Sequence, residues 1–153
     1  MRDRGAALLG ICLGHQLRAW LDGNPVDSGQ LVFGLEPVHL TAHGKAHWLF
    51  QGLPENFVTY QCHRDYVTGV GAPARLLAIS PSCPVEAVAW DDTTITTQFH
   101  PEVPAWEVLD DLRHGADKLA VGGRRLKAEV TSVPSDYDGL MARFFDNFLR
   151  RVA

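Results

Sequence analysis

Hydrophobic and polar residues follow one another in patterns that predict a mixed α/β fold. Ala6–Ile11 is a continuous apolar run, too short for a helix by itself and typical of a strand that is buried on both faces. Gly14–Asp22 follows with Leu17, Trp20 and Leu21 on one side, the spacing of an amphipathic helix. The chain therefore opens with a predicted strand and helix in direct succession.

Short apolar runs in the middle of the chain predict further strands. Gln30–Gly34 and Glu36–Thr41 alternate apolar with polar residues, as strands with one exposed face do. Ala46–Phe50 predicts a short helix, and Asp91-Asp92 predicts a hairpin turn. The remaining predicted strands are Phe57–Gln61, Arg75–Ser80, Val85–Trp90 and Thr93–Phe99.

The last third of the chain is predicted to be helical. Pro104 suits a helix start, where its missing N–H costs nothing, and Trp106, Leu109 and Leu112 then share a face. Gly122-Gly123, followed by basic residues, predicts a surface loop.

The clearest predicted helix lies near the C-terminal end of the sequence. Ser135 can cap it, and Asp138, three residues later, fits a capping box. Apolar residues then recur at helical spacing, which predicts that this face packs on a core. The stripe consists of Tyr137, Leu140, Met141, Phe144, Phe145, Phe148 and Leu149.

Length and charge narrow the classes of protein. We expect the 153 residues to form one domain spanning 1–153. The 14 basic and 18 acidic side chains give a net charge of −4, without the basic excess of a nucleic-acid-binding protein. No apolar run approaches the about 18 residues of a membrane span, and the N-terminal run lacks the cleavage site of a signal peptide.

Cysteine and histidine usage indicates the compartment and the cofactor class. An odd, sparse set of three cysteines argues against a disulfide framework and predicts a reducing, cytoplasmic location. No CxxC or HExxH occurs, so we expect no metal ion and no other cofactor. The alternative is a weak surface metal site at His39, His43 and His47.

The segment around Cys12 predicts a reactive cysteine. The predicted strand runs into Gly10-Ile11-Cys12-Leu13-Gly14 and then into a helix, the nucleophile-elbow pattern with cysteine in place of serine. A turn this sharp predicts that a side chain at Gly10 or Gly14 would collide with neighbouring backbone. The helix N-terminus favours a thiolate at Cys12, and the Leu13 N–H points at a developing oxyanion.

A second segment supplies a base and a carboxylate. In Gln98-Phe99-His100-Pro101-Glu102, His100 can act as general base and then general acid, while Glu102 orients the imidazole. Cys12 and His100 both follow predicted strands, and ligands bind at the carboxyl ends of strands in α/β sheets. Either motif alone also fits a buried cysteine or an ordinary loop, but together they favour a catalytic Cys12-His100-Glu102 triad.

These motifs resemble those of the class I (triad) glutamine amidotransferases. Gly10–Gln16 and Gln98–Glu102 are similar to the two most diagnostic motifs of that family, and His63–Val67 resembles its His-x-Asp-x-Val segment. Leu77–Ser80 with Cys83 resembles the stretch that follows. The helical tail looks like that of free-standing members similar to the amidotransferase domain of GMP synthase.

The resemblance implies a fold and a reaction. The fold is a flavodoxin-like, three-layer α/β/α domain with a mixed, mostly parallel sheet. Cys12 attacks the side-chain amide of glutamine, His100 protonates the leaving ammonia, and a glutamyl thioester forms and is hydrolysed. Ammonia then passes to a synthase domain or partner.

The same resemblance suggests roles for other residues. Gln16 would help to bind glutamine, and the segment around His63 and Asp65 would line the same pocket, although Asp65 fits equally well a role in holding its own loop. His15 is interpreted as structural. Cys62 and Cys83 are interpreted as packing residues, since buried free cysteine is common.

The position of the elbow departs from the family pattern. Family members carry several strands and helices before the elbow, whereas here the elbow cysteine is residue 12. We therefore expect an N-terminally truncated domain: a fragment of a longer enzyme, one half of a split domain completed by another chain, or a degenerate protein. Ala6–Ile11 would then present an unpaired edge to a second chain or a second copy.

Three functions remain open on the sequence. The first is glutamine hydrolysis by the triad. The second is a non-catalytic module that pairs through its exposed strand edge. The third is a γ-glutamyl hydrolase, although Leu13 and Phe99 favour the amidotransferase over it.

Overall fold

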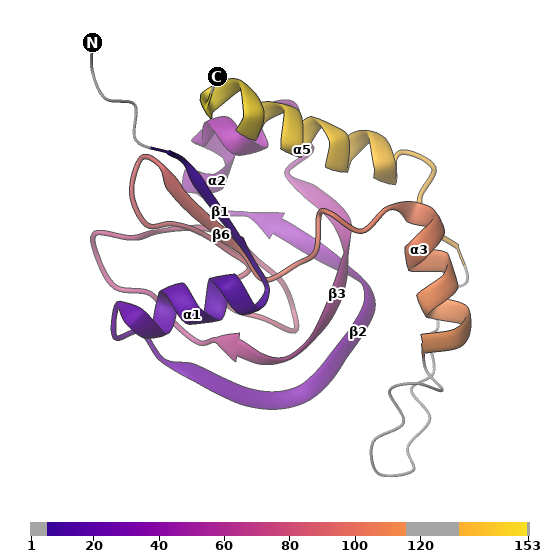
Figure 1. The fold of residues 1–153 in the computed structure, drawn as a ribbon, viewed down its shortest axis with the longest axis horizontal. Helices are drawn as coiled ribbons and strands as arrows, with labels where there is room; N and C mark the ends of the chain where they lie inside the picture. The colour runs from indigo at the N-terminus through magenta and orange to yellow at the C-terminus, as the bar shows by residue number, and fades with distance from the viewer. Residues whose placement is uncertain (1–5, 116–131, 153) are drawn as a thin grey trace.

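Residues 6–115 and 132–152 are described by a computed structural model, drawn in Figure 1. The order of elements is β1 (Leu8–Ile11), α1 (Leu13–Leu21), β2 (Val26–Leu40), α2 (Ala42–Ala46), η1 (Trp48–Phe50), β3 (Asn56–Val67), β4 (Arg75–Ile79), β5 (Ala87–Ala89), β6 (Thr94–Thr97), α3 (Ala105–Asp110), η2 (Asp111–Gly115) and α5 (Tyr137–Val152). The predicted loop at Gly122-Gly123 lies outside the described residues.

The six strands form one curled, mixed sheet in the order β1-β6-β5-β4-β2-β3. The mixed α/β class is confirmed, but only β1 and β6 pair in parallel, so within the described residues the expectation of a mostly parallel sheet is wrong. The reason is connection length. A parallel pair needs a crossover of about a dozen residues or more, whereas loops 80–86 and 90–93 are short.

Helices cover both faces of the sheet, which confirms the three-layer arrangement. Along β5, Ala87 and Ala89 belong to one apolar cluster, while Val88 belongs to another that includes Ala19 of α1. Because side chains alternate across a strand, the two clusters lie on opposite faces. Helix α5 packs on the first face and α1 on the second, as Figure 1 shows.

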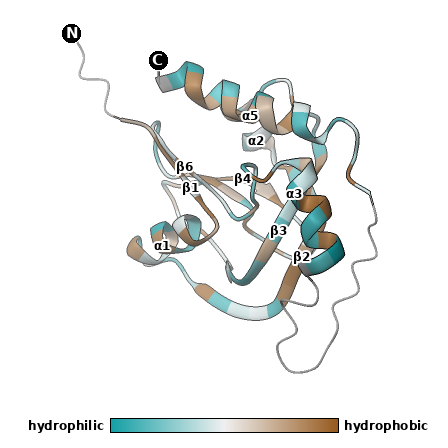
Figure 2. Cartoon of the chain, turned by 45° about the vertical axis from the view of Figure 1, so that its right-hand side comes forward, coloured by the Kyte–Doolittle hydropathy of each residue, from teal (hydrophilic) through white to brown (hydrophobic). Residues whose placement is uncertain are grey.

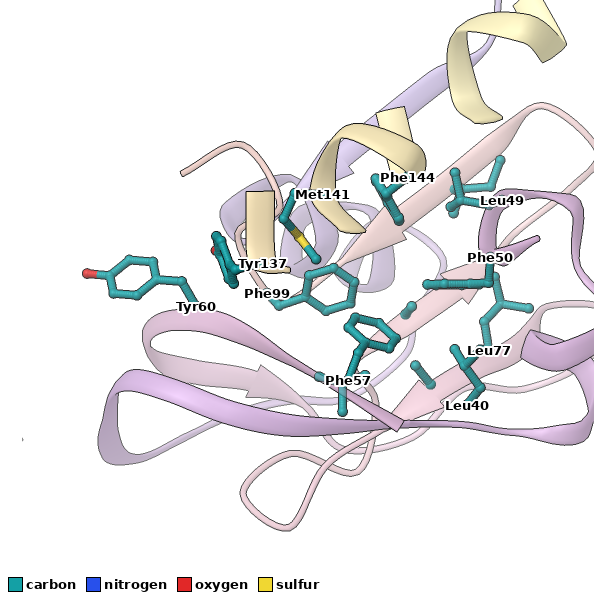
Figure 3. Close-up of a cluster of buried hydrophobic side chains, with 14 of the residues drawn as sticks. Leu40, Leu49, Phe50, Phe57, Tyr60, Leu77, Phe99, Tyr137, Met141 and Phe144 are labelled. Atoms are coloured by element: carbon teal, nitrogen blue, oxygen red, sulfur yellow. The ribbon is translucent and has the colours of Figure 1, made fainter. Parts of the chain in front are cut away.

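The larger cluster forms around α5, as its apolar stripe predicts. Tyr137, Met141 and Phe144 are almost fully buried against strand residues such as Phe57 and Phe99 (Figure 3). Each fully buried side chain of this size contributes about 1.5–3 kcal/mol of transfer free energy. Leu149, at the end of the stripe, is exposed.

The capping box predicted for α5 does not form. The helix begins at Tyr137, and the Asp136 carbonyl accepts its first hydrogen bond, from Leu140 N. The Asp138 carboxylate instead accepts a hydrogen bond of 2.8 Å from Ala105 N, in the first turn of α3. An acidic residue predicted to stabilise its own helix therefore satisfies an unpaired N–H of another helix.

Helix α3 begins after Pro104 as predicted, but it packs through a different face. Val108 and Leu112 are buried, whereas Trp106 is 70% exposed. The expected shared face of Trp106, Leu109 and Leu112 is therefore wrong at Trp106. The chain changes to a π-helix at Asp111, which rotates the residues that follow relative to a regular α-helix.

Other boundaries differ from the predicted ones. Gln30–Gly34 and Glu36–Thr41 belong to one strand, β2, with an irregularity in its register between Ser28 and Val32. The predicted helix at Ala46–Phe50 is divided into α2, which ends at Ala46, and the 3-10 turn η1. The Asp91-Asp92 turn is confirmed between antiparallel β5 and β6.

Strand β1 is not buried on both faces. It is the end strand of the described sheet and pairs with β6 alone, and Leu8 is 52% exposed. An apolar run predicts burial, but the burial of a strand depends on its neighbours in the sheet. None of the helices within residues 6–115 and 132–152 combines the length and apolarity needed to cross a membrane.

Candidate active site

Cys12 occupies a strained turn between β1 and α1. Its φ of 50° and ψ of −101° make it the single non-glycine residue with positive φ in the described part of the chain. Such a conformation is rare for a side chain with a Cβ and is found at functional sites. The Cys12 N–H donates to Thr97 O at 2.8 Å, which fixes the turn against β6.

Helix α1 begins directly after the thiol. Cys12 is its N-cap residue, and no side chain caps this end. The first N–H groups of a helix, including that of Leu13, have no partner within the helix, and the helix dipole favours negative charge there. The turn therefore combines a sulfur nucleophile with a free N–H donor, as its sequence predicts.

Gly10 and Gly14 differ in how closely they are packed. A Cβ at Gly10 would lie 2.9 Å from Thr96 Cγ2 and 3.2 Å from the Gly14 carbonyl, so that position has no room for a side chain. A Cβ at Gly14 would meet nothing within 4 Å, so the predicted collision at Gly14 is wrong. The crowded space is the gap between strand and helix, and only position 10 faces it.

His100 lies beside Cys12 and is held by two elements. Its backbone N–H donates to Tyr60 O at 2.9 Å, which ties the residue to β3. Its Nδ1 is 2.7 Å from Glu102 Oε1, and its Nε2 is buried without a protein hydrogen bond. The pairing with Glu102 leaves Nε2 as the nitrogen available for chemistry.

The electrostatic surroundings favour a charged imidazole. Burial by itself would lower the pKa of His100, but contacts with the Cys12 sulfur and the Glu102 carboxylate outweigh it and raise the pKa from 6.5 to about 10. His100 is therefore an imidazolium at neutral pH, next to the thiol.

Gln16 connects the elbow to the predicted pocket segment. Its Nε2 lies 2.6 Å from Asp65 O and 3.2 Å from Gln98 Oε1. The side chain of Asp65 is exposed, and its backbone carbonyl forms this contact. The structure thus brings Gln16 and Asp65 together at one end of the sheet.

His63 is buried next to this cluster. Neither of its ring nitrogens has a protein hydrogen bond, and burial above all lowers its pKa, with the nearby charge of His100 acting in the same direction. A neutral, unpartnered imidazole in this place has both nitrogens available to a ligand.

Comparisons with known proteins identify the family. The family model described as glutamine amidotransferase class-I matches residues 1–107. The chain belongs to the class I glutamine amidotransferases.

Two curated relatives are both named as a glutamine-hydrolysing subunit of GMP synthase. The chain is 38% identical over 114 residues to the protein of Pyrococcus furiosus and 36% identical over 115 residues to that of Methanopyrus kandleri. Each alignment covers 73% of this chain, but only 56% and 60% of the two relatives. The chain therefore spans less than two thirds of the length of these relatives.

Solved structures share the amidotransferase fold. A glutamine amidotransferase from Thermotoga maritima superposes with a TM-score of 0.70 at 23% identity, over 94% of this chain and 61% of that one. A glutamine amido transferase from Methylobacillus flagellatus gives a TM-score of 0.72 at 17% identity, over 96% and 64% of the two chains. At these identities the likeness shows the fold.

Three residues near the amidotransferase site had no role assigned from the sequence. Gln98 Nε2 donates to Cys12 Sγ at 3.6 Å, so this side chain contacts the thiol directly. The ring of Tyr60 lies 6.0 Å from that of His100, and its hydroxyl donates to Asp111 Oδ2 at 2.7 Å. Gln98 stands inside a recognised motif, whereas nothing in the sequence brings Asp111 near Cys12.

His15 anchors the elbow helix to the sheet. It is fully buried, with Nδ1 2.7 Å from Thr96 Oγ1 and Nε2 3.1 Å from Val85 O. Burial lowers its pKa to about 4, so the ring is neutral. Because the Val85 carbonyl only accepts, Nε2 carries the proton and Nδ1 accepts from the threonine hydroxyl. These contacts agree with the structural role predicted for His15.

The alternative metal site does not form. No group of three or more histidine, cysteine or acidic side chains in the described ranges could hold an ion. His39 pairs with Asn56, and His47 Nδ1 accepts from Leu49 N. A cavity of about 740 Å³ lies beside His47 and Arg75, but its lining contains none of Cys12, His100 and Glu102.

The two elbow glycines provide a test of the turn. Gly10→Ala should destabilise the fold by about 1–3 kcal/mol, because its Cβ overlaps Thr96 and no void exists to receive it. Gly14→Ala, the matched control, should be neutral or stabilising by up to about 1 kcal/mol, since alanine favours a helix. Urea unfolding followed by circular dichroism measures both; equal losses would contradict this account.

The titration of His100 provides a second test. Its Cε1–H resonance should titrate near pH 10 in the wild type, and Cys12→Ala should lower that pKa because one of its two raising contacts is lost. Cys62→Ala is the control and should leave it unchanged. The linked stabilisation is fully present below about pH 6.5 and is lost as the pH rises towards 10. A wild-type His100 that titrates near 6.5 would refute the ion pair.

Proposed function

We propose that this chain hydrolyses the side-chain amide of glutamine through a Cys12-His100-Glu102 triad. The observation that carries the proposal is the strained Cys12 turn at the start of α1, with the His100–Glu102 pair beside it. Strain, a helix N-terminus and an oriented base meet at one sulfur, and the chain belongs to an amidotransferase family.

The first step forms a thioester. The Cys12 thiolate attacks the amide carbon, and the carbonyl oxygen becomes an oxyanion that the Leu13 N–H stabilises. The imidazolium of His100 gives its proton to the leaving nitrogen, the C–N bond breaks, and ammonia departs. Glu102 holds the ring through Nδ1, so that Nε2 faces the reacting atoms.

The second step releases glutamate. His100, now neutral, takes a proton from water, and the resulting hydroxide attacks the thioester carbon. The C–S bond breaks, Cys12 leaves as a thiolate, and His100 is again an imidazolium. The two steps consume glutamine and water, produce glutamate and ammonia, and balance without a cofactor.

Four side chains are proposed to hold the substrate. Gln98 contacts the nucleophile and Gln16 at once, so it aligns the sulfur with the substrate pocket. His63 offers two unpartnered nitrogens, and Gln16 and Asp65 close the pocket on the side of β3. Ammonia would pass to a synthase partner, since the curated relatives are named as a glutamine-hydrolysing subunit of GMP synthase.

Cys12→Ala tests the reaction directly. The wild type should release glutamate from glutamine, and the variant should lose at least about a thousandfold of that rate, because no other group can form the thioester. An enzyme-coupled glutamate assay measures this loss, and mass spectrometry should locate a glutamine-like chloroketone on Cys12.

Cys62→Ala is the matched control and should retain activity. Glutamate release that survives Cys12→Ala, or labelling confined to Cys62 or Cys83, would overturn the proposal. γ-Glutamyl amines assayed beside glutamine decide between the amidotransferase and the γ-glutamyl hydrolase, since a hydrolase would prefer the substituted amides.

A second candidate function rests on the exposed surface around β1. The free side of this strand has no partner in the described sheet, and α1 next to it exposes large apolar side chains. Hydrophobic residues are visible on α1 in Figure 2. The exposed residues are Leu8, Leu13, Leu17, Trp20 and Leu21. An unpaired edge beside such a patch is suited to strand pairing with another copy of the chain.

Trp20→Glu tests this interface. If two copies pair through β1 and α1, the charge should weaken association by about tenfold or more, as loss of a buried interface tryptophan does. Trp106→Glu is the control, because Trp106 is equally exposed but lies on α3. Sedimentation velocity measures the dimer fraction. A wild type that stays monomeric at about 100 µM, where an interface of standard size would associate, refutes the pairing.

A further inference from the structure

We propose that Asp111 recognises the ammonium group of the substrate and thereby selects an α-amino acid amide for the site. The inference deepens the proposed glutamine hydrolysis and rests on it. It assigns a specificity role to a residue of η2, an element outside the motifs of the site.

Asp111 reaches the site through one tyrosine. Its Oδ2 accepts a 2.7 Å hydrogen bond from the Tyr60 hydroxyl, and the Tyr60 ring lies 6.0 Å from the ring of His100. In Figure 3 the Tyr60 hydroxyl points away from the apolar cluster, so the ring spans from the core to its edge. The carboxylate is therefore one side chain and one hydrogen bond away from the catalytic imidazole.

The environment of Cys62 gives the same placement independently. Burial raises the pKa of Cys62, and the nearby charges of Cys12 and Asp111 raise it further. Both groups must then lie within electrostatic range of one thiol. Cys12, Cys62 and Asp111 consequently share one region of the molecule.

The local backbone holds Asp111 in this place. It begins a π-helical turn, Asp111–Gly115, directly after α3, and π-helical turns are rare and concentrate at functional sites. The next residue, Leu112, is buried in the main core and packs over Gly34, where a Cβ would lie 3.3 Å from Leu112 Cδ2. A buried anchor thus fixes the neighbouring carboxylate at the edge of the site.

This feature belongs to the part of the chain beyond residue 107, where the match to the family model ends. Asp111 therefore contributes a charge that the matched region does not supply. Tyr60 occupies Oδ2, and no hydrogen bond from the described residues reaches Oδ1. A carboxylate with one oxygen held and the other available is suited to binding a cationic group.

The charges around the site indicate which cation this is. Glu102 is engaged by His100, and Asp65 contacts Gln16 through its backbone, so neither has been given to the substrate. Glutamine carries its α-ammonium a few bonds from the amide that Cys12 attacks. Asp111 at the edge of the site supplies the opposite charge, whereas a substrate without that ammonium would leave the carboxylate unpaired.

Two chloroketones separate recognition from chemistry. One is the glutamine analogue 2-amino-5-chloro-4-oxopentanoate, and the other is 5-chloro-4-oxopentanoate, which lacks only the ammonium group. In both, the Cys12 thiolate forms a C–S bond, the C–Cl bond breaks and chloride leaves. The measurement is the second-order rate of Cys12 labelling for each reagent, followed by intact mass.

Asp111→Asn is the decisive variant, because asparagine still accepts the Tyr60 hydrogen bond but carries no charge. The wild type should label with the amino reagent about tenfold or more faster than with the deamino reagent, and the variant should lose most of that ratio. Asp110→Asn, the neighbouring control, should keep it, because Asp110 pairs with His114. The rate with the deamino reagent should be similar in all three proteins.

The outcomes distinguish the two proposals. A ratio that is unchanged in Asp111→Asn, or a parallel loss with both reagents, overturns the role of Asp111 while leaving glutamine hydrolysis intact. Failure of both reagents to label Cys12 in the wild type overturns the proposed function and this inference together. A lowered ratio in Asp110→Asn would show a general effect of charge on this helix and would equally refute the assignment to Asp111.

Discussion

The parallel pairing of β1 with β6 is the interaction on which the site depends. The register sets Ile11 opposite Thr97, and the Cys12 N–H continues the ladder to Thr97 O. Because parallel strands end at the same edge of a sheet, the residues that follow them are neighbours, although 88 positions of sequence separate Cys12 from His100. If β1 slipped along β6, the thiol would move away from the imidazole with it.

The strain at Cys12 is maintained by contacts around the turn. Gly10 allows the strand to approach Thr96 closely, and the neutral ring of His15 fastens the other side of the turn to Thr96 and Val85. Fully satisfied buried hydrogen bonds of this kind hold one arrangement of the backbone against competing ones. The positive φ at Cys12 is thus the local consequence of packing on either side of it.

The charge of His100 depends on a similar balance. Burial opposes the imidazolium, and two close negative partners restore it, with Glu102 on one nitrogen and the sulfur near the other. The same partners orient the ring, so that geometry and protonation state have one origin. Tyr60 joins this group to η2 and to the core beneath α5, which links the site to an element formed far along the chain.

The sequence by itself determined the local chemistry of this protein. A strand followed by Gly-x-Cys-x-Gly and a helix predicts the elbow, because the short-range sterics of the turn require those residue types, and the aromatic stripe of α5 likewise predicts its buried face. Only the tertiary structure decided the exposure of β1, the antiparallel majority of the described sheet, the free space at Gly14, the use of Asp138 as a cap for α3 and the position of Asp111. Each of these depends on which distant segment becomes a neighbour, and such long-range contacts are set by the packing of the whole sheet rather than by any local pattern.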